Sequence, residues 1–187
     1  MALFEYTMVM VSIVLALGVA QLLGGISELV RSPHAYLAHT FWVLALFFYH
    51  VLLWWAMWDF RKIENWTFLA FMYLILGPTL LFFATNLLLP RTATESTDWE
   101  THFFSVRLWF FMAMAATVIW GISVTWLVGT VPLNHPYRIA QVGRLLFFVA
   151  GIITVKRRVH IWIAISYVVY FLATALIFRL LPTLSPG

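Results

Sequence analysis

Six long apolar runs, separated by short charged or proline-containing turns, constrain this chain more than any other feature. Each run has roughly the 20 residues that a helix needs to cross about 30 Å of hydrocarbon. Inside lipid, an α-helix satisfies the backbone hydrogen bonds of such a run within the segment itself. The sequence therefore predicts an all-α, polytopic transmembrane helical bundle that forms a single domain of 187 residues.

The turns set the bounds of the expected spans. Proline ends a helix or begins the next one, and Pro33, Pro90 and Pro136 stand at three of the turns. The six expected spans are residues 7–30, 35–58, 66–89, 98–128, 136–155 and 159–181. The fifth span is marginal in length, and a half-crossing there would leave five crossings, with the two termini on opposite faces.

The composition excludes a water-soluble domain. Hydrophobic residues make up 64% of the chain and charged residues only 10%, which is too little charge to cover a surface in water. The small net charge of +4 fits basic loops beside anionic lipid, and we expect no nucleic-acid partner. We expect the lipid bilayer of a bacterial cytoplasmic membrane as the environment. We also expect a homo-oligomer or a subunit of a membrane complex, because six short helices leave little room for a cavity.

Sidedness and internal symmetry rest on short patterns. We call the N-terminal side of the bundle side A and the opposite side B; the basic turn Lys156-Arg157-Arg158 favours side B as cytoplasmic. The tripeptide Gly25-Ile-Ser27 recurs at Gly121-Ile-Ser123, and Leu-Leu-Pro ends the third and sixth spans. These matches favour two three-helix inverted repeats, an arrangement typical of transporters.

Arg144 is the polar residue that most needs an explanation. It lies near the middle of the fifth span, where an arginine costs a few kcal/mol or more unless it is paired or solvated. Three interpretations stay open: it snorkels to side A to meet Asp59 and Glu64, it is held by carbonyls or by Gln21 and Tyr167, or it lines a polar cavity. No acidic residue shares its depth, so a ligand in such a cavity would be anionic or carbonyl-bearing.

Depth counting at about 1.5 Å per residue groups other polar residues with Arg144. The third span contains Gly77-Pro78, and proline predicts a midplane kink with carbonyls open to a donor. Our first hypothesis is a small channel or transporter with a midplane site for a small anionic or polar solute. Its candidate ligand-binding residues are Arg144, Gln141, Gln21, His50, Tyr167 and Tyr170. This hypothesis requires no cofactor.

A second constellation lies near side B. His39, His102 and His160 occupy similar depths on the second, fourth and sixth spans, with Glu28 on the first. Histidines with a carboxylate can bind a divalent metal, and two facing histidines can bind haem b, so a redox or metal-binding subunit is the alternative. Glu28 is also the expected salt-bridge partner of Arg107.

A third possibility is a non-catalytic assembly or sensing subunit of a membrane complex. Phosphate-loop, His-Glu-x-x-His and Gly-x-Ser-x-Gly motifs are absent from the sequence, so we do not expect an enzyme. In the first span, Gly18, Gln21, Gly25 and Glu28 share one face, which favours a position for that helix inside the bundle.

Overall fold

The computed structural model describes residues 3–63, 66–90 and 96–180 of the chain. Within these ranges the regular structure is entirely helical, so the predicted all-α bundle is confirmed. The six α-helices are α1 (Leu3–Arg31), α2 (Leu37–Met57), α3 (Phe68–Leu88), α4 (Trp99–Leu127), α5 (Tyr137–Ile153) and α6 (Arg157–Ala175). A short 3-10 turn, η1 (Trp58–Lys62), follows α2, and a π-helical turn, η2 (Leu176–Leu180), follows α6. The last residue of the expected sixth span, Leu181, lies outside the described residues.

Local sequence explains where these helices begin and end. The Asp98 side chain caps α4 by accepting hydrogen bonds from the backbone N–H groups of Glu100 and Thr101, and the Thr67 hydroxyl caps α3 in the same way. Gly129, with φ at +73°, ends α4 in the left-handed conformation that glycine adopts without strain. The α3 helix continues through Pro78 to Leu88.

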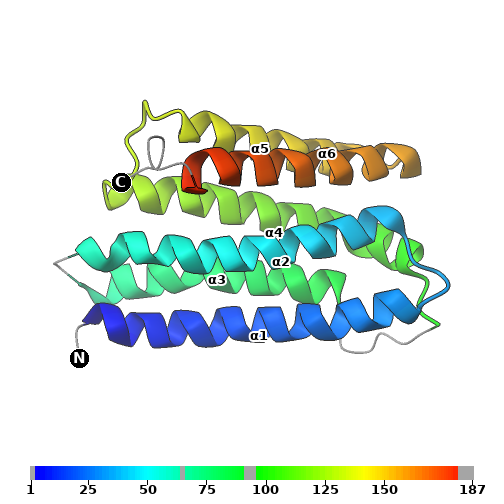
Figure 1. Ribbon diagram of the computed structural model, residues 1–187, viewed down its shortest axis with the longest axis horizontal. Helices are drawn as coiled ribbons and strands as arrows, with labels where there is room; N and C mark the ends of the chain where they lie inside the picture. Colours follow the sequence, from blue (N-terminus) through cyan, green and yellow to red (C-terminus); the bar gives the residue numbers. More distant parts are fainter. Residues whose placement is uncertain (1–2, 64–65, 91–95, 181–187) are drawn as a thin grey trace.

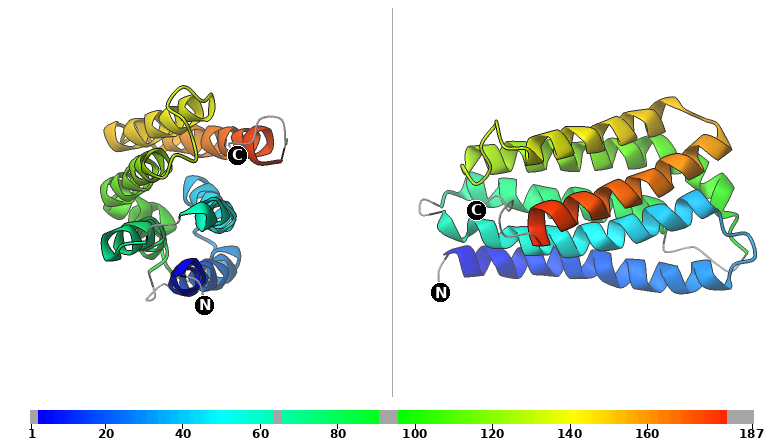
Figure 2. Two further views of the ribbon diagram at one scale, coloured as in Figure 1. Left: turned by 90° about the vertical axis from the view of Figure 1, so that its left-hand side faces the viewer. Right: turned by 45° about the horizontal axis from the view of Figure 1, so that its top comes forward.

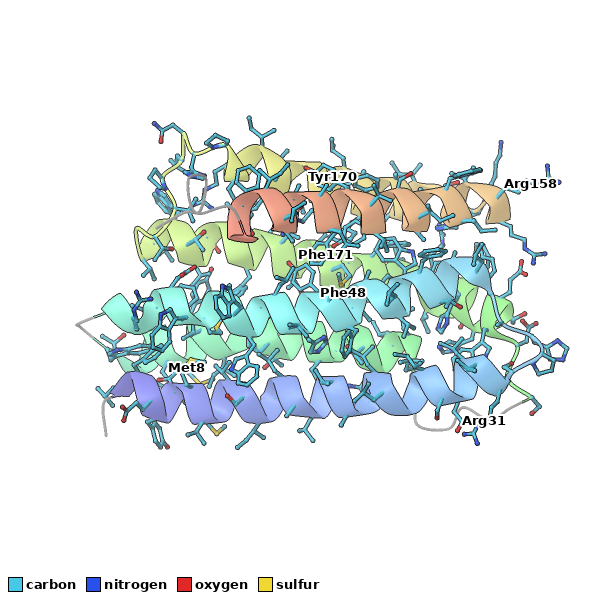
Figure 3. All side chains as sticks on the ribbon, in the orientation of Figure 1. Met8, Arg31, Phe48, Arg158, Tyr170 and Phe171 are labelled. Carbon is cyan, nitrogen blue, oxygen red and sulfur yellow. The ribbon has the colours of Figure 1, made fainter. Side chains whose placement is uncertain are left out.

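The helices run up and down and form a closed ring in the order α1, α3, α4, α5, α6, α2. Figure 1 shows them side by side, and the end-on view in Figure 2 shows the ring. Arg31 at the end of α1 and Arg158 at the start of α6 lie at the same end of the bundle, which is side B (Figure 3). The α6 helix ends on side A, where α1 begins (Figure 1).

Five of the described helices are long and apolar enough to span a membrane: α1, α2 with η1, α3, α4 and α6. This is a multi-pass membrane protein. The α5 helix has only 17 residues, about 25 Å at 1.5 Å per residue. However, α4 and α6 run in the same direction, from side B to side A, so the chain between them has to return across the bundle (Figure 2). The α5 helix makes that return.

The interior of the bundle differs from expectation in two respects. Among the five apolar spans, α2 and α4 are the most buried and α1 is the least buried; α1 packs on α2 and α3. Its Gly18 accommodates the ring of His50, so the small-residue face serves close packing with a neighbour. The helix contacts also differ between the two halves: α1 packs directly on α3, but α5 separates the backbones of α4 and α6.

Candidate functional site

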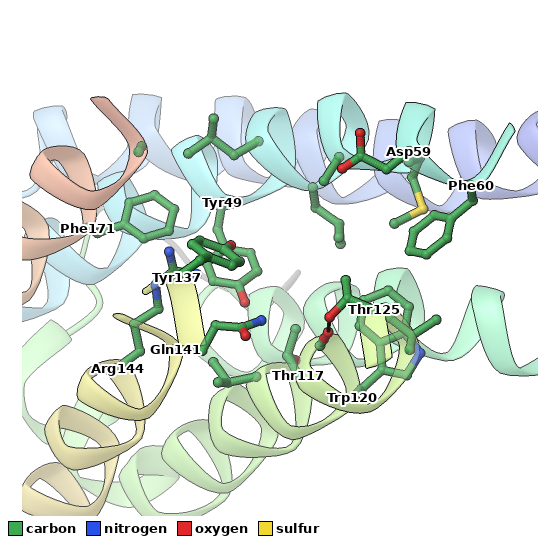
Figure 4. A pocket seen from close by; sticks show the side chains of 18 residues that line it. Tyr49, Asp59, Phe60, Thr117, Trp120, Thr125, Tyr137, Gln141, Arg144 and Phe171 are labelled. Atoms are coloured by element: carbon green, nitrogen blue, oxygen red, sulfur yellow. Dashed lines mark hydrogen bonds between the residues drawn. The ribbon is translucent and has the colours of Figure 1, made fainter. Parts of the chain in front are cut away.

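A cavity with about 80 Å³ of space lies between α2, α4, α5 and α6. It extends from Arg144 and Phe171, in the middle of the bundle, to Asp59 and Phe60 at the side-A end of α2 (Figure 4). A water needs about 10–15 Å³ of such space, so the cavity has room for several waters or one small solute. Four helices of one protomer thus enclose a cavity, although we expected six short helices to leave little room for it.

Arg144 lies at the inner end of this cavity and is only 7% exposed. Its guanidinium carbon is 5.2 Å from the ring centre of Phe171 and 5.5 Å from that of Tyr137. One Nη atom lies 3.4 Å from the Thr174 hydroxyl, and Nε has no hydrogen-bond partner among the described residues. Arg144 therefore lines a cavity and is buried rather than exposed at the surface; Glu64, one of its expected partners at side A, lies outside the described residues.

Gln141, one turn before Arg144, also lines the cavity and is buried. Its amide orientation is set by Arg138, which donates a 3.0 Å hydrogen bond from Nη1 to the Gln141 Oε1 atom. The amide oxygen is thus occupied, and the NH₂ group remains to face the cavity. Arg144 and Gln141 therefore both present hydrogen-bond donors to the cavity, which α5 also lines with Tyr137.

A layer of aromatic rings closes the cavity on its side-B face. The same four helices supply it, within about two turns of the residues that line the cavity, and all its rings are fully buried. The Trp42 ring centre lies 4.7 Å from that of Tyr167 and 5.2 Å from that of Phe111, and Phe148 lies 5.2 Å from Tyr167. We call this layer the floor; it consists of Trp42, Phe110, Phe111, Phe148 and Tyr167. Access to Arg144 is consequently from side A.

Beyond the floor, a polar clasp joins the helix ends at side B. Arg157 pairs with Glu100 at 3.0 Å, and its guanidinium lies 5.7 Å from the ring centre of Tyr36. The Tyr36 hydroxyl donates to the backbone oxygen of Arg157. Burial raises the pKa of Tyr36 to about 12, so the hydroxyl remains a donor at neutral pH. The clasp holds α2, α4 and α6 together on the closed side.

Comparison of the chain with protein-family models, curated proteins and solved structures finds no match. Its membrane character follows from composition and from helix length. Its site is defined by the cavity, the floor and the donors on α5.

The structure brings some of the predicted ligand-binding residues together and separates others. Arg144 and Gln141 share the cavity. Tyr167 belongs to the floor, and its hydroxyl has no partner among the described residues. Tyr170 faces α5 instead, where its hydroxyl donates to Ala140 O at 3.1 Å.

The other midplane candidates lie away from Arg144. His50 packs on α1 and forms a 2.8 Å hydrogen bond from Nδ1 to its own helix at Leu46 O. Gln21 donates to the Leu89 carbonyl at the end of α3. Gly77, beside Pro78, lies against the ring of Trp120, which lines the cavity and donates from its indole to Tyr73 O at 2.7 Å. The Gly77-Pro78 pair thus supports the cavity wall from outside.

The side-B histidines bind the ends of neighbouring helices. His39 and His102 place Nε2 2.9 Å from the carbonyls of Leu88 and Leu87, beside the Gln21–Leu89 contact. Three side chains from three helices therefore satisfy the last carbonyls of α3, groups that a helix leaves without intrahelical partners. His160 binds Thr154 O, at the end of α5, in the same way.

Arg107 and Glu28 do not form the expected pair. Arg107 donates to the carbonyls of Gly151, Ile152 and Thr154, whereas Glu28 pairs with Arg31 at 2.7 Å. No group of three His, Asp or Glu side chains in residues 3–63, 66–90 and 96–180 is arranged to bind one metal ion. The metal or haem site remains a prediction.

Sequence reasoning missed three aromatic residues that shape the site. The rings of Tyr137 and Phe171 both contact the guanidinium of Arg144, and Tyr49 on α2 also lines the cavity. Depth alone could have suggested Phe171, one residue after Tyr170. The rotation of α6, which points Phe171 inward and Tyr170 toward α5, depends on contacts between helices.

Proposed function

We propose that this protein is a small membrane transporter that binds an anionic solute at Arg144. The observation that carries the proposal is a buried guanidinium at the inner end of a cavity, without a carboxylate within 4 Å among the described residues. A buried charge without a counterion is unfavourable, and an anion entering from side A would remove that cost.

A transporter explains the cavity better than an open channel. The floor of five buried rings separates Arg144 from side B, and the clasp of Tyr36, Glu100 and Arg157 lies beyond it. Such a site is accessible from one side at a time if the floor and clasp open when side A closes. Alternating access of this kind uses a fixed central site between helices that move relative to one another.

Flux into liposomes tests the proposal. Purified protein is reconstituted, and uptake of radiolabelled acetate, chloride and phosphate is compared with protein-free liposomes. We expect uptake of at least one anion, and loss of that uptake in Arg144→Met. The matched control is Arg158→Met, which removes an exposed arginine on side B and should leave uptake unchanged. Equal uptake by the wild type and Arg144→Met would overturn the role of Arg144.

The alternative of a metal- or haem-binding subunit has less support from the geometry. The Nε2 atoms of His39, His102 and His160 all contact backbone carbonyls, so a metal would have to use Nδ1 or displace these contacts. A visible absorption spectrum with metal analysis of the purified protein tests it. A Soret band or a stoichiometric metal would favour this alternative over the transporter.

A further inference from the structure

The wall of the cavity specifies the chemical class of the anion more closely than Arg144 does. The wall between Arg144 and side A is mostly apolar: Leu52, Leu53 and Met57 from α2 face Val118 and Val124 from α4. Apolar walls cannot replace the water that a strongly hydrated inorganic anion gives up on entry. They do stabilise a methylene group, because its burial removes apolar surface from water.

Two donors from α5 lie together at the inner end of the cavity. Arg144 and the Gln141 NH₂ group are three residues apart on α5, which places them on one helix face. Arg138 holds the Gln141 amide so that the donor, not the acceptor, faces inward. A guanidinium beside an amide donor suits the two oxygens of a carboxylate, which accepts from both.

The other charged side chain lining the cavity, Asp59, lies at the far end from Arg144 (Figure 4). A second negative charge on the solute would therefore lie nearer to this carboxylate and farther from the arginine. The charge distribution along the cavity favours a solute with one charged end.

We propose that the substrate is a short-chain monocarboxylate, with its carboxylate on Arg144 and Gln141 and its hydrocarbon tail directed toward side A. The inference rests on the proposed function, because it concerns the same cavity. It adds Gln141 as a residue that binds the substrate and Arg138 as a positioning residue. The small size of the cavity favours short chains, and acids of two to four carbons test this.

Calorimetric titration of the detergent-purified protein with acetate, propionate and butyrate tests whether the hydrocarbon tail contributes to binding. Each added methylene should tighten binding about three- to fourfold, because it is buried against the apolar wall. Butyramide, which has the tail without the charge, should bind at least tenfold more weakly than butyrate, and so should chloride and phosphate. The variant Leu53→Ser should reduce the gain in affinity per added methylene, because Leu53 lines the apolar wall.

The amide donor is tested separately with Gln141→Leu. This variant should weaken the binding of all three acids by a similar factor, about five- to tenfold, because it removes an N–H donor to the carboxylate of the substrate. The gain in affinity per methylene should persist, because the apolar wall is unchanged. The control is Val142→Ala, a change at the neighbouring lipid-exposed position. Circular dichroism and the gel-filtration profile in detergent establish that each variant is folded before titration.

The outcomes distinguish this inference from the proposed function. If the wild type binds acetate, propionate and butyrate with equal affinity, or binds chloride or phosphate as tightly as butyrate, the proposal of a monocarboxylate substrate is wrong. Arg144-dependent anion transport could then still hold. Binding of these acids that survives Arg144→Met would overturn the orientation of the substrate. If no anion binds and no flux depends on Arg144, both proposals are wrong.

Discussion

Arg138 and Arg144 lie less than two turns apart on α5, and each is 7% exposed, yet their surroundings differ completely. Arg138 donates to the carbonyls of Ile122 and Val131, to the Thr125 hydroxyl and to Gln141. Arg144 contacts the rings of Tyr137 and Phe171 and the Thr174 hydroxyl, and it has further side-chain contacts with Tyr137 and Tyr49. Its Nε has no partner among the described residues. Depth and exposure therefore do not distinguish these two arginines; the partners of their guanidinium groups do.

The same distinction applies to the two ends of the bundle. On side B, Arg107, His39, His102 and His160 all bind carbonyls at helix ends, where α3 and α5 leave acceptors without intrahelical donors. These polar residues stabilise the bundle. Around the cavity, Arg144 and Gln141 from α5 line open space instead, and the proposed anion site rests on this difference.

The largest expected effect comes from removing Arg138. Arg138→Met leaves the Ile122 and Val131 carbonyls and the Gln141 amide oxygen without this donor, and each buried orphan group costs about 1–3 kcal/mol. We expect a loss of about 3–4 kcal/mol in the free energy of unfolding, measured by denaturation with SDS in mixed micelles. An unchanged unfolding curve would mean that the helix-end contacts contribute little.

A smaller loss is expected at the end of α3. His39→Leu removes the donor to the Leu88 carbonyl from a fully buried position, at a cost of about 1–3 kcal/mol. The control Leu37→Ala, on an exposed position two residues earlier, should be nearly neutral in the same assay. If His39→Leu is as stable as the wild type but loses a bound metal or haem, the histidines have a binding role instead.

Arg144→Met should have the opposite sign from Arg138→Met. It removes a buried charge without a carboxylate partner in the described part of the chain, so stability should stay equal or rise by about 1 kcal/mol. Anion binding and uptake should be lost at the same time. If Arg144→Met destabilised the protein as much as Arg138→Met, the inferred difference in role between the two arginines would be wrong.

The smallest effect is expected at Asp98, outside the membrane. Hydrogen bonds from the hydroxyl and backbone N–H of Thr101 hold the pKa of the Asp98 carboxyl below its usual range. A depressed pKa in the folded state adds stability above the unfolded pKa, near pH 4, and this stability is lost as pH falls through the folded value.

The matched variant Asp98→Asn keeps an acceptor for the α4 N-terminus without a titrating carboxyl. The melting temperature of the wild type should thus decline slightly more than that of Asp98→Asn between pH 6 and pH 3. Parallel declines would show that the pKa of Asp98 is the same in the folded and unfolded states.

Much of the fold was predictable because it depends on local hydropathy. The six helices lie within a few residues of the expected spans, since apolar length and turn residues act along the chain. The shared face of Gln141 and Arg144 was equally predictable, because residues three apart on one helix point the same way. For the same reason, the depth of Arg144 could be counted from the sequence.

Only the tertiary structure decided which residues meet. Gln21 and His50 share the depth of Arg144. However, α1 packs on α2 and α3, whereas α5 packs on α4 and α6, so Gln21 binds the end of α3 and His50 packs on Gly18. Glu28 and Arg107 share a level yet face different neighbours. Periodicity determines how deep a residue lies and which face of its own helix it occupies. The rotation and order of helices come from packing between segments far apart in the chain, and these determined that Arg144 faces a cavity lined by Tyr49, Tyr137 and Phe171.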